Sequence, residues 1–417
     1  MTEKKKIVVL ADHPMSPSGV GTQTKYFVDA LLKTGRYKFI CFGGAIRHED
    51  SRPMKTEEWG DDLIIFPVKG YGDVHLVREV VWNERPDAVW IMTDPRFWGW
   101  LWEIEEEIRS HCSLIYYHVW DNYPYPTYNK KFYKSNDAIA TISKVTADIV
   151  QTVSPETKHR HIPHAVPEVF NVVPEETRKQ FREDNFAEDS DKFIIFWNNR
   201  NARRKQSGSL IFWFKKFLDK IGHDKAILIM HTDTKDAHGQ DLDAIVENLG
   251  LNDGQVKFSR QKIPPHALAL LYNGVDVTVN ISDAEGFGLA TLESLSCGTP
   301  IIVNMTGGLQ EQVTDGKNWF GIGIEPSSKA IIGSQEIPFI REDRIYEDDF
   351  VDALVEMYKK THKQRRKLGL MGRKHAEKNY SFEDLEKSWV EFVDEVIKEN
   401  GSWHTRKNYR SWEQIQL

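Results

Sequence analysis

The chain has 417 residues, of which 40% are hydrophobic and 28% are charged. This balance is typical of a globular protein and excludes a disordered tail protein, a collagen-like repeat or a disulfide scaffold. At roughly 150 residues per domain, the length predicts two or three compact domains. The formal charge of −7 argues against a broad basic face for DNA or RNA, although it leaves room for a local groove.

The cysteines and the N-terminus indicate the compartment. Cys41, Cys112 and Cys297 show no paired spacing, which predicts reduced thiols and a cytoplasmic protein. The apolar run before Asp12 is shorter than the ~7–15 residues of a secretory signal. No apolar run approaches the ~20 residues that span a bilayer, so we expect any membrane contact to be peripheral.

In residues 1–170, short apolar runs alternate with amphipathic segments of helical length. This alternation is typical of βαβ units around a parallel sheet. The run Ile7–Leu10 has no polar alternation, as expected for a strand covered by helices on both sheet faces. The predicted strands are Lys6–Leu10, Lys38–Phe42, Leu63–Val68, Ala88–Met92, Leu114–Tyr117, Ala138–Ile142 and His161–Pro163, with helices at Thr22–Leu32, Val74–Asn83 and Phe97–Ile108.

Charged residues become dense over 171–192, which we interpret as a linker with one polar helix. A second alternating series over 193–380 predicts another doubly wound domain, with a loop insertion at Ile324–Asp349. A helix and an aromatic tail, 381–417, are expected to pack back on the first domain. The strands predicted here are Phe193–Trp197, Ala226–Met230, Val256–Phe258, Val277–Ile281 and Ile301–Val303, and the last helices are Phe350–Tyr358, Arg365–Asn379 and Phe382–Glu399.

A glycine-containing turn follows the first predicted strand. Gly19 and Gly21 open a helix, and such a turn presents N–H groups and a positive dipole end to an anion. The dinucleotide fingerprint is incomplete, because Thr24 stands in place of its third glycine. The alternative is that both glycines only permit a tight turn.

His118 ends the strand Leu114–Tyr117, at the sheet edge where open α/β folds place ligand groups. Its imidazole is a candidate ligand contact. Trp120, Tyr123 and Tyr125 follow it and are candidates for stacking on an acceptor. The alternative for His118 is a histidine that is simply hydrogen-bonded within the fold.

Two basic residues follow the first strand of the second domain. Arg200 and Lys205 lie five apart, and together they could hold a diphosphate, with a guanidinium fork and an ammonium point charge. Arg203 and Arg204 stand between them, so the run could equally be a solvated surface.

A glycine-rich motif, Asp283–Glu293, follows the strand Val277–Ile281. Its glycines allow a ligand to approach the backbone, and its helix points N–H groups at an anion. Glu285 in the turn and Glu293 in the helix could hold two hydroxyl-bearing parts of one ligand. Another glycine turn, Thr306–Gly308, comes next.

Together these motifs resemble the retaining glycosyltransferases of family 4, over nearly the whole chain. The resemblance rests on the sequence EGFGLATLE with Glu285 and Glu293, the Arg200/Lys205 pair, the Gly307-Gly308 turn and the Cys-Gly-Thr-Pro that follows Ser296. It implies an α/β protein of GT-B fold, with two doubly wound Rossmann-like parallel-sheet domains facing a central cleft.

The resemblance also implies roles for individual residues. Arg200 and Lys205 would hold the donor diphosphate, Glu293 would bind the ribose hydroxyls, and His118 would face the donor sugar. The catalytic set implied is Glu285, His118, Arg200 and Lys205, and the remaining donor contacts are Gly19, Gly21, Gly286, Phe287, Gly288 and Leu289. Where the family usually has glycine, this chain has Asn199 and Gln206, and His164–Pro167 replaces its usual Asn-Gly-Val-Asp.

The activity implied is retaining transfer of a sugar from a UDP- or GDP-sugar to an acceptor hydroxyl, in glycan, glycolipid or glycoconjugate synthesis. No metal and no cofactor is expected, since the Asp189/Asp191 and Asp241/Asp243 pairs look like solvated or capping carboxylates. The acceptor domain would be residues 1–170 and the nucleotide-sugar domain 193–380.

Other functions stay open at this point. A nucleotide-sugar epimerase or hydrolase would need no acceptor, and a silent binding module would keep the fold without turnover. The basic run Lys359–Lys367 is the sole support for a transferase acting on modified nucleic acid bases, and a solvated helix explains it as well. Lys130–Lys134 could touch a membrane or a glycan, whereas Trp98, Trp100 and Trp102 are expected to be mainly core.

Overall fold

The computed structural model describes residues 3–16, 18–46 and 52–411, which form two compact units. Unit 1 contains the chain up to His164, Gly333–Phe339, and the segment from Glu383 onward. Unit 2 contains Ala165–Ile332 and Ile340–Phe382. Residues 1–2 of the predicted first domain and 412–417 of the predicted tail lie outside the described residues.

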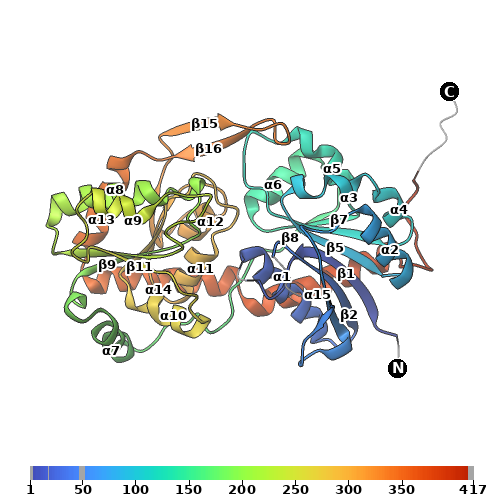
Figure 1. Cartoon of the computed structure of the whole chain (residues 1–417), viewed down its shortest axis with the longest axis horizontal. Helices are drawn as coiled ribbons and strands as arrows, with labels where there is room; N and C mark the ends of the chain where they lie inside the picture. Colours follow the sequence, from blue (N-terminus) through green and yellow to red (C-terminus); the bar gives the residue numbers. More distant parts are fainter. Residues whose placement is uncertain (1–2, 17, 47–51, 412–417) are drawn as a thin grey trace. The chain divides into compact units, whose positions relative to one another are not determined.

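Unit 1 is built on an eight-stranded sheet with the order β3-β4-β2-β1-β5-β6-β7-β8 (Figure 1). All neighbouring strands are parallel except β3, which is antiparallel to β4. The sheet therefore reverses its strand order between β1 and β5, and open α/β sheets bind ligands at that point. The strands are β1 (Lys5–Asp12), β2 (Tyr37–Gly44), β3 (Met54–Lys55), β4 (Leu63–Pro67), β5 (Ala88–Thr93), β6 (Ser113–His118), β7 (Ala138–Thr141) and β8 (His159–His161).

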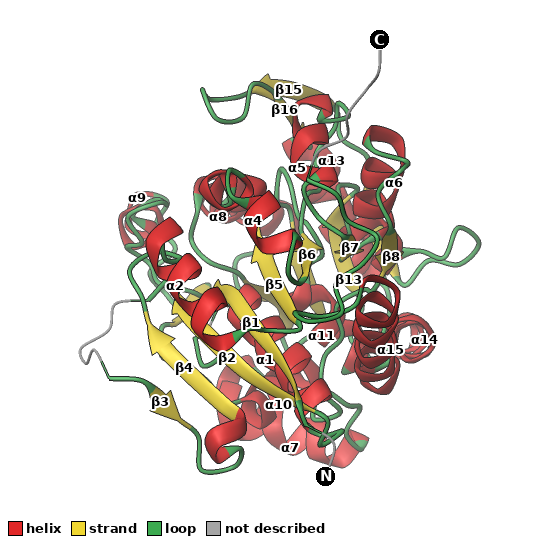
Figure 2. Cartoon of the chain, turned by 90° about the vertical axis from the view of Figure 1, so that its right-hand side faces the viewer, coloured by secondary structure: helices red, strands yellow, loops and turns green. Residues whose placement is uncertain are grey.

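The helices of unit 1 begin where the sequence supplies caps. Ser18, Asp73 and Ser143 each accept a hydrogen bond from a backbone N–H in the first turn of the following helix. Figure 2 shows β2, β1 and β5 side by side with helices around them. The α-helices are α1 (Gly19–Leu32), α2 (Val74–Glu84), α3 (Gly99–Trp102), α4 (Glu105–Arg109), α5 (Lys130–Lys134), α6 (Lys144–Val153) and α15 (Phe382–Asn400), with 3-10 turns at Gly60–Asp62, Pro95–Phe97 and Thr127–Asn129.

Aromatic rings fill much of the core of unit 1. Trp90 of β5 stacks on Phe27 of α1 with centroids 4.2 Å apart, and Trp389 of α15 packs edge-on against both rings. Trp98 and Trp102 are buried, as expected. The helix predicted over Phe97–Ile108 is wrong in one respect. It is broken into separate short turns, because the backbone leaves the helical region at Trp98 and Ile104, where both side chains are buried.

The segment after α15 also belongs to unit 1. Arg406 donates to the Arg109 carbonyl and to Asp137, and Tyr409 donates to Glu105. Trp403 stacks on His111 with centroids 4.4 Å apart. The aromatic residues of the described tail therefore serve as anchors to α4 and its surroundings.

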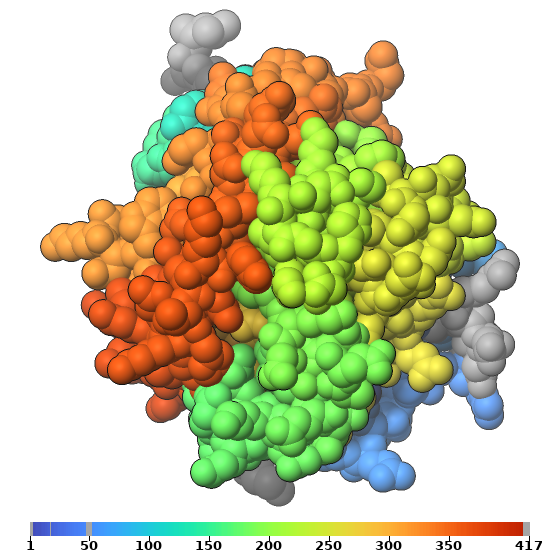
Figure 3. Space-filling view, turned by 90° about the vertical axis from the view of Figure 1, so that its left-hand side faces the viewer, coloured from blue at the N-terminus to red at the C-terminus, as the bar shows by residue number. Residues whose placement is uncertain are grey.

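Unit 2 is built on a six-stranded parallel sheet with the order β11-β10-β9-β12-β13-β14. Helix α13 packs against α8, and Figure 3 shows the two side by side in orange-red and yellow-green. The strands are β9 (Phe193–Asn198), β10 (Ala226–His231), β11 (Val256–Ser259), β12 (Val277–Asn280), β13 (Ile301–Asn304) and β14 (Gly321–Ile324). The α-helices are α7 (Glu175–Phe186), α8 (Ser207–Ile221), α9 (Leu242–Asn248), α10 (Pro265–Gly274), α11 (Leu289–Ser296), α12 (Leu309–Val313), α13 (Glu347–Lys359) and α14 (His362–Asn379), with 3-10 turns at Ala187–Asp189 and Arg203–Lys205.

The segment Ile324–Asp349 is not the loop insertion that its composition predicts. It contains an antiparallel hairpin of β15 (Ser328–Ile332) and β16 (Ile340–Arg344), which form a separate two-stranded sheet, drawn in orange in Figure 1. Hydropathy does not reveal β16, because its most buried residue is Glu342, which is only 2% exposed. Arg203 and Arg344 form ion pairs with this buried carboxylate.

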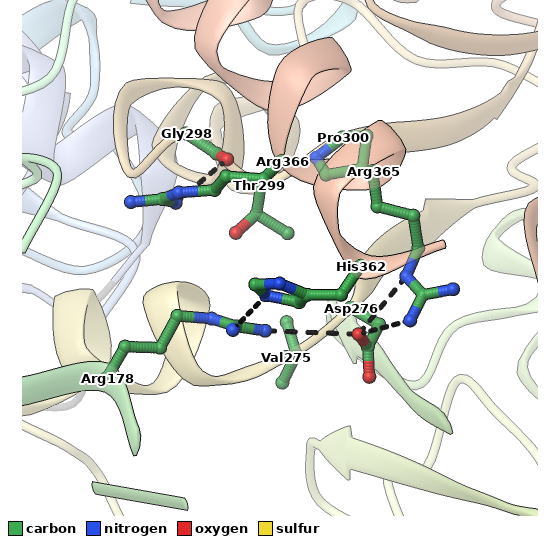
Figure 4. A pocket seen from close by; sticks show the side chains of 9 residues that line it. All are labelled: Arg178, Val275, Asp276, Gly298, Thr299, Pro300, His362, Arg365 and Arg366. Carbon is green, nitrogen blue, oxygen red and sulfur yellow. Dashed lines mark hydrogen bonds and ion pairs between the residues drawn. The ribbon is translucent and has the colours of Figure 1, made fainter. Parts of the chain in front are cut away.

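A cluster of arginines joins α7 and α14 to the sheet of unit 2 (Figure 4). Arg178, Arg182 and Arg365 surround the buried carboxylate of Asp276, and their charges outweigh its burial and hold its pKa low. Arg366 donates to the Gly298 carbonyl just beyond α11. Several of these guanidiniums bond carbonyls at helix C-termini, where the dipole is negative. The cluster therefore has a structural role, since it ties α7 and α14 to the sheet. Arg365 and Arg366 of the basic run Lys359–Lys367 belong to it.

The three cysteines lie in the protein interior. Cys41, Cys112 and Cys297 are free and buried, and burial raises the pKa of each thiol. Among the helices in the described part of the chain, none is both long enough and apolar enough to cross a bilayer.

Candidate active site

Three loops of unit 2 leave the same edge of the sheet. The loop Asn199–Lys205 follows β9, Asp283–Gly288 lies beyond β12, and Thr306–Gly308 lies beyond β13. These strands are neighbours in the order β9-β12-β13 and run parallel. Their carboxyl ends therefore bring together the basic turn and both glycine turns that the sequence singles out.

Lys205 and Glu285 form a buried ion pair between the first two loops. Lys205 ends the 3-10 turn after β9 and is 7% exposed, and Glu285 is 9% exposed. Burial opposes ionisation of Glu285, but the charges of Lys205 and Arg204 outweigh it and lower its pKa. Asn280 also donates to the Glu285 carboxylate at 3.4 Å. The site thus places the Lys205 ammonium against the Glu285 carboxylate at the start of a glycine turn.

A buried glutamine donates hydrogen bonds to the glycine turn that leads into α11. Gln312 of α12 donates from Nε2 to the carbonyls of Phe287 and Gly288, at 2.7 and 3.2 Å. Gly288 has a φ of +90°, a conformation that favours glycine. Leu289 then opens α11. The backbone of the loop that carries Glu285 is consequently held by hydrogen bonds that do not involve the Glu285 carboxylate.

Glu293 lies one turn further along α11 and is bonded to a tyrosine. Tyr272 of α10 donates to its carboxylate at 2.7 Å, and Asn198 donates to the Tyr272 hydroxyl at 2.9 Å. Burial raises the pKa of Glu293 to about 7, against a smaller opposing effect of the Tyr272 hydrogen bond. Glu293 therefore exchanges a proton near neutral pH.

Arg200 bonds Asp236, a different carboxylate from the Glu285 that pairs with Lys205. Its side chain is 62% exposed, and its guanidinium donates to Asp236, at 2.6 Å from Nε and 3.1 Å from Nη2. The side chain is on the same loop, but its hydrogen bonds face the segment after β10. A joint role in holding a diphosphate stays a prediction for this pair.

Gly19 and Gly21 lie in the first turn of α1 in unit 1. Gly21 donates from its backbone N–H to Ser18 Oγ at 2.9 Å, and a Cβ at Gly21 would lie 2.6 Å from the His13 carbonyl oxygen. The tight-turn alternative explains Gly21 in full. Binding of a donor by this turn stays a prediction.

His118 is fully buried between two tyrosines. Tyr116 donates to the Thr93 carbonyl, so its oxygen accepts from His118 Nδ1 at 3.0 Å, and Nε2 accepts from Tyr133 at 2.8 Å. Burial lowers the pKa of His118 to about 3, which keeps the imidazole neutral. This geometry corresponds to the hydrogen-bonded alternative. Contact of His118 with a ligand stays a prediction, and it requires Tyr133 to release Nε2.

The residues predicted to stack on an acceptor divide into two groups. Trp120 is 5% exposed and donates to the Asn122 carbonyl, so it is part of the core and not an open wall. Tyr123 and Tyr125 both donate to Asp148, and Tyr125 is 39% exposed. Only the tyrosines of this trio therefore present a surface in unit 1.

Sequence reasoning missed several polar residues around the loops of unit 2. Tyr272 and Asn198 hold Glu293, and Asp283 bonds the loop after β9. Burial raises the pKa of Asp283 to about 6. Glu342 and Asp343 of β16 contact all three loops. Asn198 stands beside the basic turn and Asp283 is the first residue of the glycine-rich motif, a signal that could have been used, whereas Tyr272 carries no local pattern.

No group of three or more His, Cys, Asp or Glu side chains in the described residues is arranged to hold a metal ion. Binding of a donor without a metal stays a prediction.

The fold of the two units and the edge of unit 2 where these loops meet define the class: this is an α/β protein of the GT-B fold. Sucrose-phosphate synthase from Thermosynechococcus elongatus superposes with a TM-score of 0.74 at 16% identity, over 95% of this chain and 100% of that one. HepE of Anabaena, solved with UDP and glucose, gives a TM-score of 0.68 at 14% identity over 94% and 100%.

Within that class, residues 177–336 match the family described as Glycosyl transferases group 1. A D-inositol 3-phosphate glycosyltransferase of Acidothermus cellulolyticus is 31% identical over 137 residues, which are 30% of each chain. One of Streptosporangium roseum is 43% identical over 75 residues, 18% of this chain and 17% of the relative. The matched segments thus span less than a third of these curated relatives. Residues 177–336, almost all of them in unit 2, are therefore similar to a glycosyl transferases group 1 domain.

Proposed function

We propose that the protein is a glycosyltransferase that moves a sugar from a UDP- or GDP-sugar to an acceptor hydroxyl, with retention at the anomeric carbon and without a metal. The observation that carries the proposal is the buried Lys205–Glu285 pair at the glycine turn into α11. A buried charge pair of this kind is poorly explained by stability alone, because desolvation offsets much of its attraction. Its position at the carboxyl edge of the sheet favours a binding role.

The chemistry of these residues suits a departing diphosphate. Glycosyl transfer separates charge, because the leaving diphosphate gains negative charge while the sugar becomes cation-like. The Lys205 ammonium has three N–H donors, so it can keep Glu285 and still donate to a phosphate oxygen. Fixed charges and N–H groups that face the developing charge stabilise the transition state in a site with little water.

Glu293 is suited to hydroxyl recognition. In its ionised form it accepts hydrogen bonds only, so it can receive two neighbouring hydroxyls such as those of a ribose. Tyr272 fixes the carboxylate at 2.7 Å and keeps it facing one direction. UDP in the Anabaena structure and UDP-2-fluoro glucose in one from Escherichia coli support a nucleotide-sugar donor for this chain as well. The acceptor, a glycan, a lipid-linked sugar or another hydroxyl compound, would belong to unit 1.

Turnover and product analysis test the proposal. The protein is incubated with UDP-, GDP- and ADP-sugars, with and without hydroxyl acceptors. The products are separated and identified by mass spectrometry. We expect a glycosylated acceptor and a nucleoside diphosphate in equal amounts. Glu285→Gln, which keeps the shape of the side chain, is expected to lower kcat by roughly 100-fold or more. Lys220→Ala, on an exposed ion pair of α8, serves as the control.

Each other product identifies a different function. A new sugar nucleotide formed without an acceptor would show an epimerase, and free sugar with diphosphate would show a hydrolase. Binding of a sugar nucleotide without any turnover would show a silent binding module. Full activity of a folded Glu285→Gln variant would contradict the role of the ion pair.

A further inference from the structure

Strand β16 of the β15–β16 hairpin contacts the loops of the candidate site. Residues of β15 are mostly exposed, whereas β16 carries Glu342, which is 2% exposed. Glu342 accepts from Arg203, at 3.1 Å from Nη1, and from Arg344 at 2.8 Å. Arg203 opens the 3-10 turn that ends at Lys205. A buried carboxylate of the hairpin thus fixes the start of the basic turn.

Asp343, the next residue of β16, bonds three separate segments. Its backbone N–H donates to the Asp283 carbonyl at 2.8 Å, and its carbonyl accepts from Asn304 Nδ2 at 2.6 Å. Its side chain accepts from Thr306 Oγ1 at 2.8 Å. Only the last bond depends on the aspartate side chain. The strand therefore joins the loop after β12 to the loop after β13.

The contacts of Asp343 continue directly to the charged pair. Asp283 donates from its backbone N–H to the Arg204 carbonyl at 2.8 Å, next to Lys205. In the other turn, Gly308 donates to the Glu285 carbonyl at 3.0 Å. A substitution that loosens Thr306 would therefore act on the turn that holds Glu285, through bonds that the structure shows.

We propose that β16 is a positioning strand for the donor site, in which Asp343 sets the Thr306–Gly308 turn against Glu285 and Glu342 fixes the Arg203–Lys205 turn. The inference rests on the proposed function and deepens it, because it names residues outside the family motif on which donor affinity depends. Neither residue is a catalytic residue, since each acts through another side chain or through the backbone.

The test separates a positioning role from a merely stabilising one. Kd values for UDP and for GDP are measured by calorimetry on the full chain, beside thermal unfolding without nucleotide. Asp343→Ala removes the Thr306 bond and keeps both backbone bonds. Asp343→Asn keeps an oxygen acceptor at the same position. Asp352→Ala, on an exposed ion pair of α13, is the matched control.

We expect Asp343→Ala to weaken the better nucleotide by roughly tenfold and Asp343→Asn to stay within about threefold of the unaltered chain. Thr306→Val should weaken binding by a similar factor. Adding Thr306→Val to Asp343→Ala should weaken binding little further, because both substitutions remove the same hydrogen bond. Asp352→Ala should bind normally.

The outcomes distinguish the two proposals. If the unaltered chain binds neither UDP nor GDP, the donor class of the proposed function fails. If it binds and a folded Asp343→Ala variant binds within twofold, the positioning role is overturned. A lower melting temperature with unchanged Kd would assign β16 to stability alone. If Asp343→Ala does not fold, the Thr306→Val result decides the question.

Discussion

Glu293 has the most informative chemistry of any single residue in unit 2. Its carboxylate is bonded by Tyr272, yet burial still raises its pKa to about 7. A raised pKa of an acid means that the folded protein prefers the protonated form. Stability attributable to Glu293 is therefore highest below its ordinary pKa and is lost as the pH rises through about 7. A buried acid with a raised pKa lowers stability at neutral pH, and such groups are candidates for functional residues.

The Glu293→Gln variant tests this assignment. We expect it to be more stable than the unaltered chain at pH 8, by on the order of 1–3 kcal/mol, and to differ little at pH 4.5. Denaturant unfolding at both pH values measures the difference. Glu356→Gln, on an exposed residue of α13, should show no comparable pH dependence.

The same variant should bind nucleotide more weakly, because an amide cannot accept two hydroxyls as well as a carboxylate does. A gain in stability together with a loss of affinity would be typical of a functional residue. If Glu293→Gln is destabilising at pH 8, the raised pKa is wrong.

At the scale of elements, the start of α11 depends on how closely the two glycine turns approach. A Cβ at Gly308 would lie 2.7 Å from both the Gly286 carbonyl oxygen and the Phe287 Cα. These are backbone atoms of the loop that carries Glu285, and they have little freedom to move away. A residue without a Cβ at position 308 is therefore a condition for this arrangement of loops.

Gly308→Ala is expected to destabilise unit 2 by about 1–3 kcal/mol and to weaken nucleotide binding, since the Glu285 loop must shift. Gly99→Ala is the matched control, because a Cβ there meets nothing within 4 Å. Denaturant unfolding and nucleotide titration of both variants provide the comparison. Equal stability and equal affinity of the two alanine variants would contradict the close approach of the turns.

Elements were predictable where hydropathy alone determines them. Each strand predicted from an apolar run coincides with an observed strand to within two residues at either end. The hairpin could not be predicted from hydropathy, because Glu342 is buried by its ion pairs with Arg203 and Arg344. Arg203 is far from Glu342 in the sequence. The helix expected over Phe97–Ile108 is interrupted at Trp98 and Ile104, whose side chains are buried by neighbours that are distant in the sequence.

At the scale of the whole molecule, the alternation of strands and helices was enough to predict two doubly wound parallel sheets, and the GT-B fold confirms it. The charged motifs of unit 2 were predicted as a group, because loops that follow adjacent parallel strands meet at one edge. The partners of His118 and Trp120 could not be predicted, since burial depends on neighbours from other parts of the chain.

We propose that the Lys205–Glu285 site binds the diphosphate of a sugar nucleotide. Calorimetric titration of UDP and GDP into the unaltered chain and into Lys205→Met tests it most directly, with Lys220→Met as the control on an exposed lysine of α8. Because Lys205→Met leaves Glu285 without its ammonium, folding of the variant is checked first, and Lys205→Met with Glu285→Gln replaces it if necessary. We predict binding by the unaltered chain and the control, and at least a tenfold weaker Kd without Lys205. Absence of binding to the unaltered chain, or equal affinity without Lys205, would show that this ion pair does not bind the diphosphate.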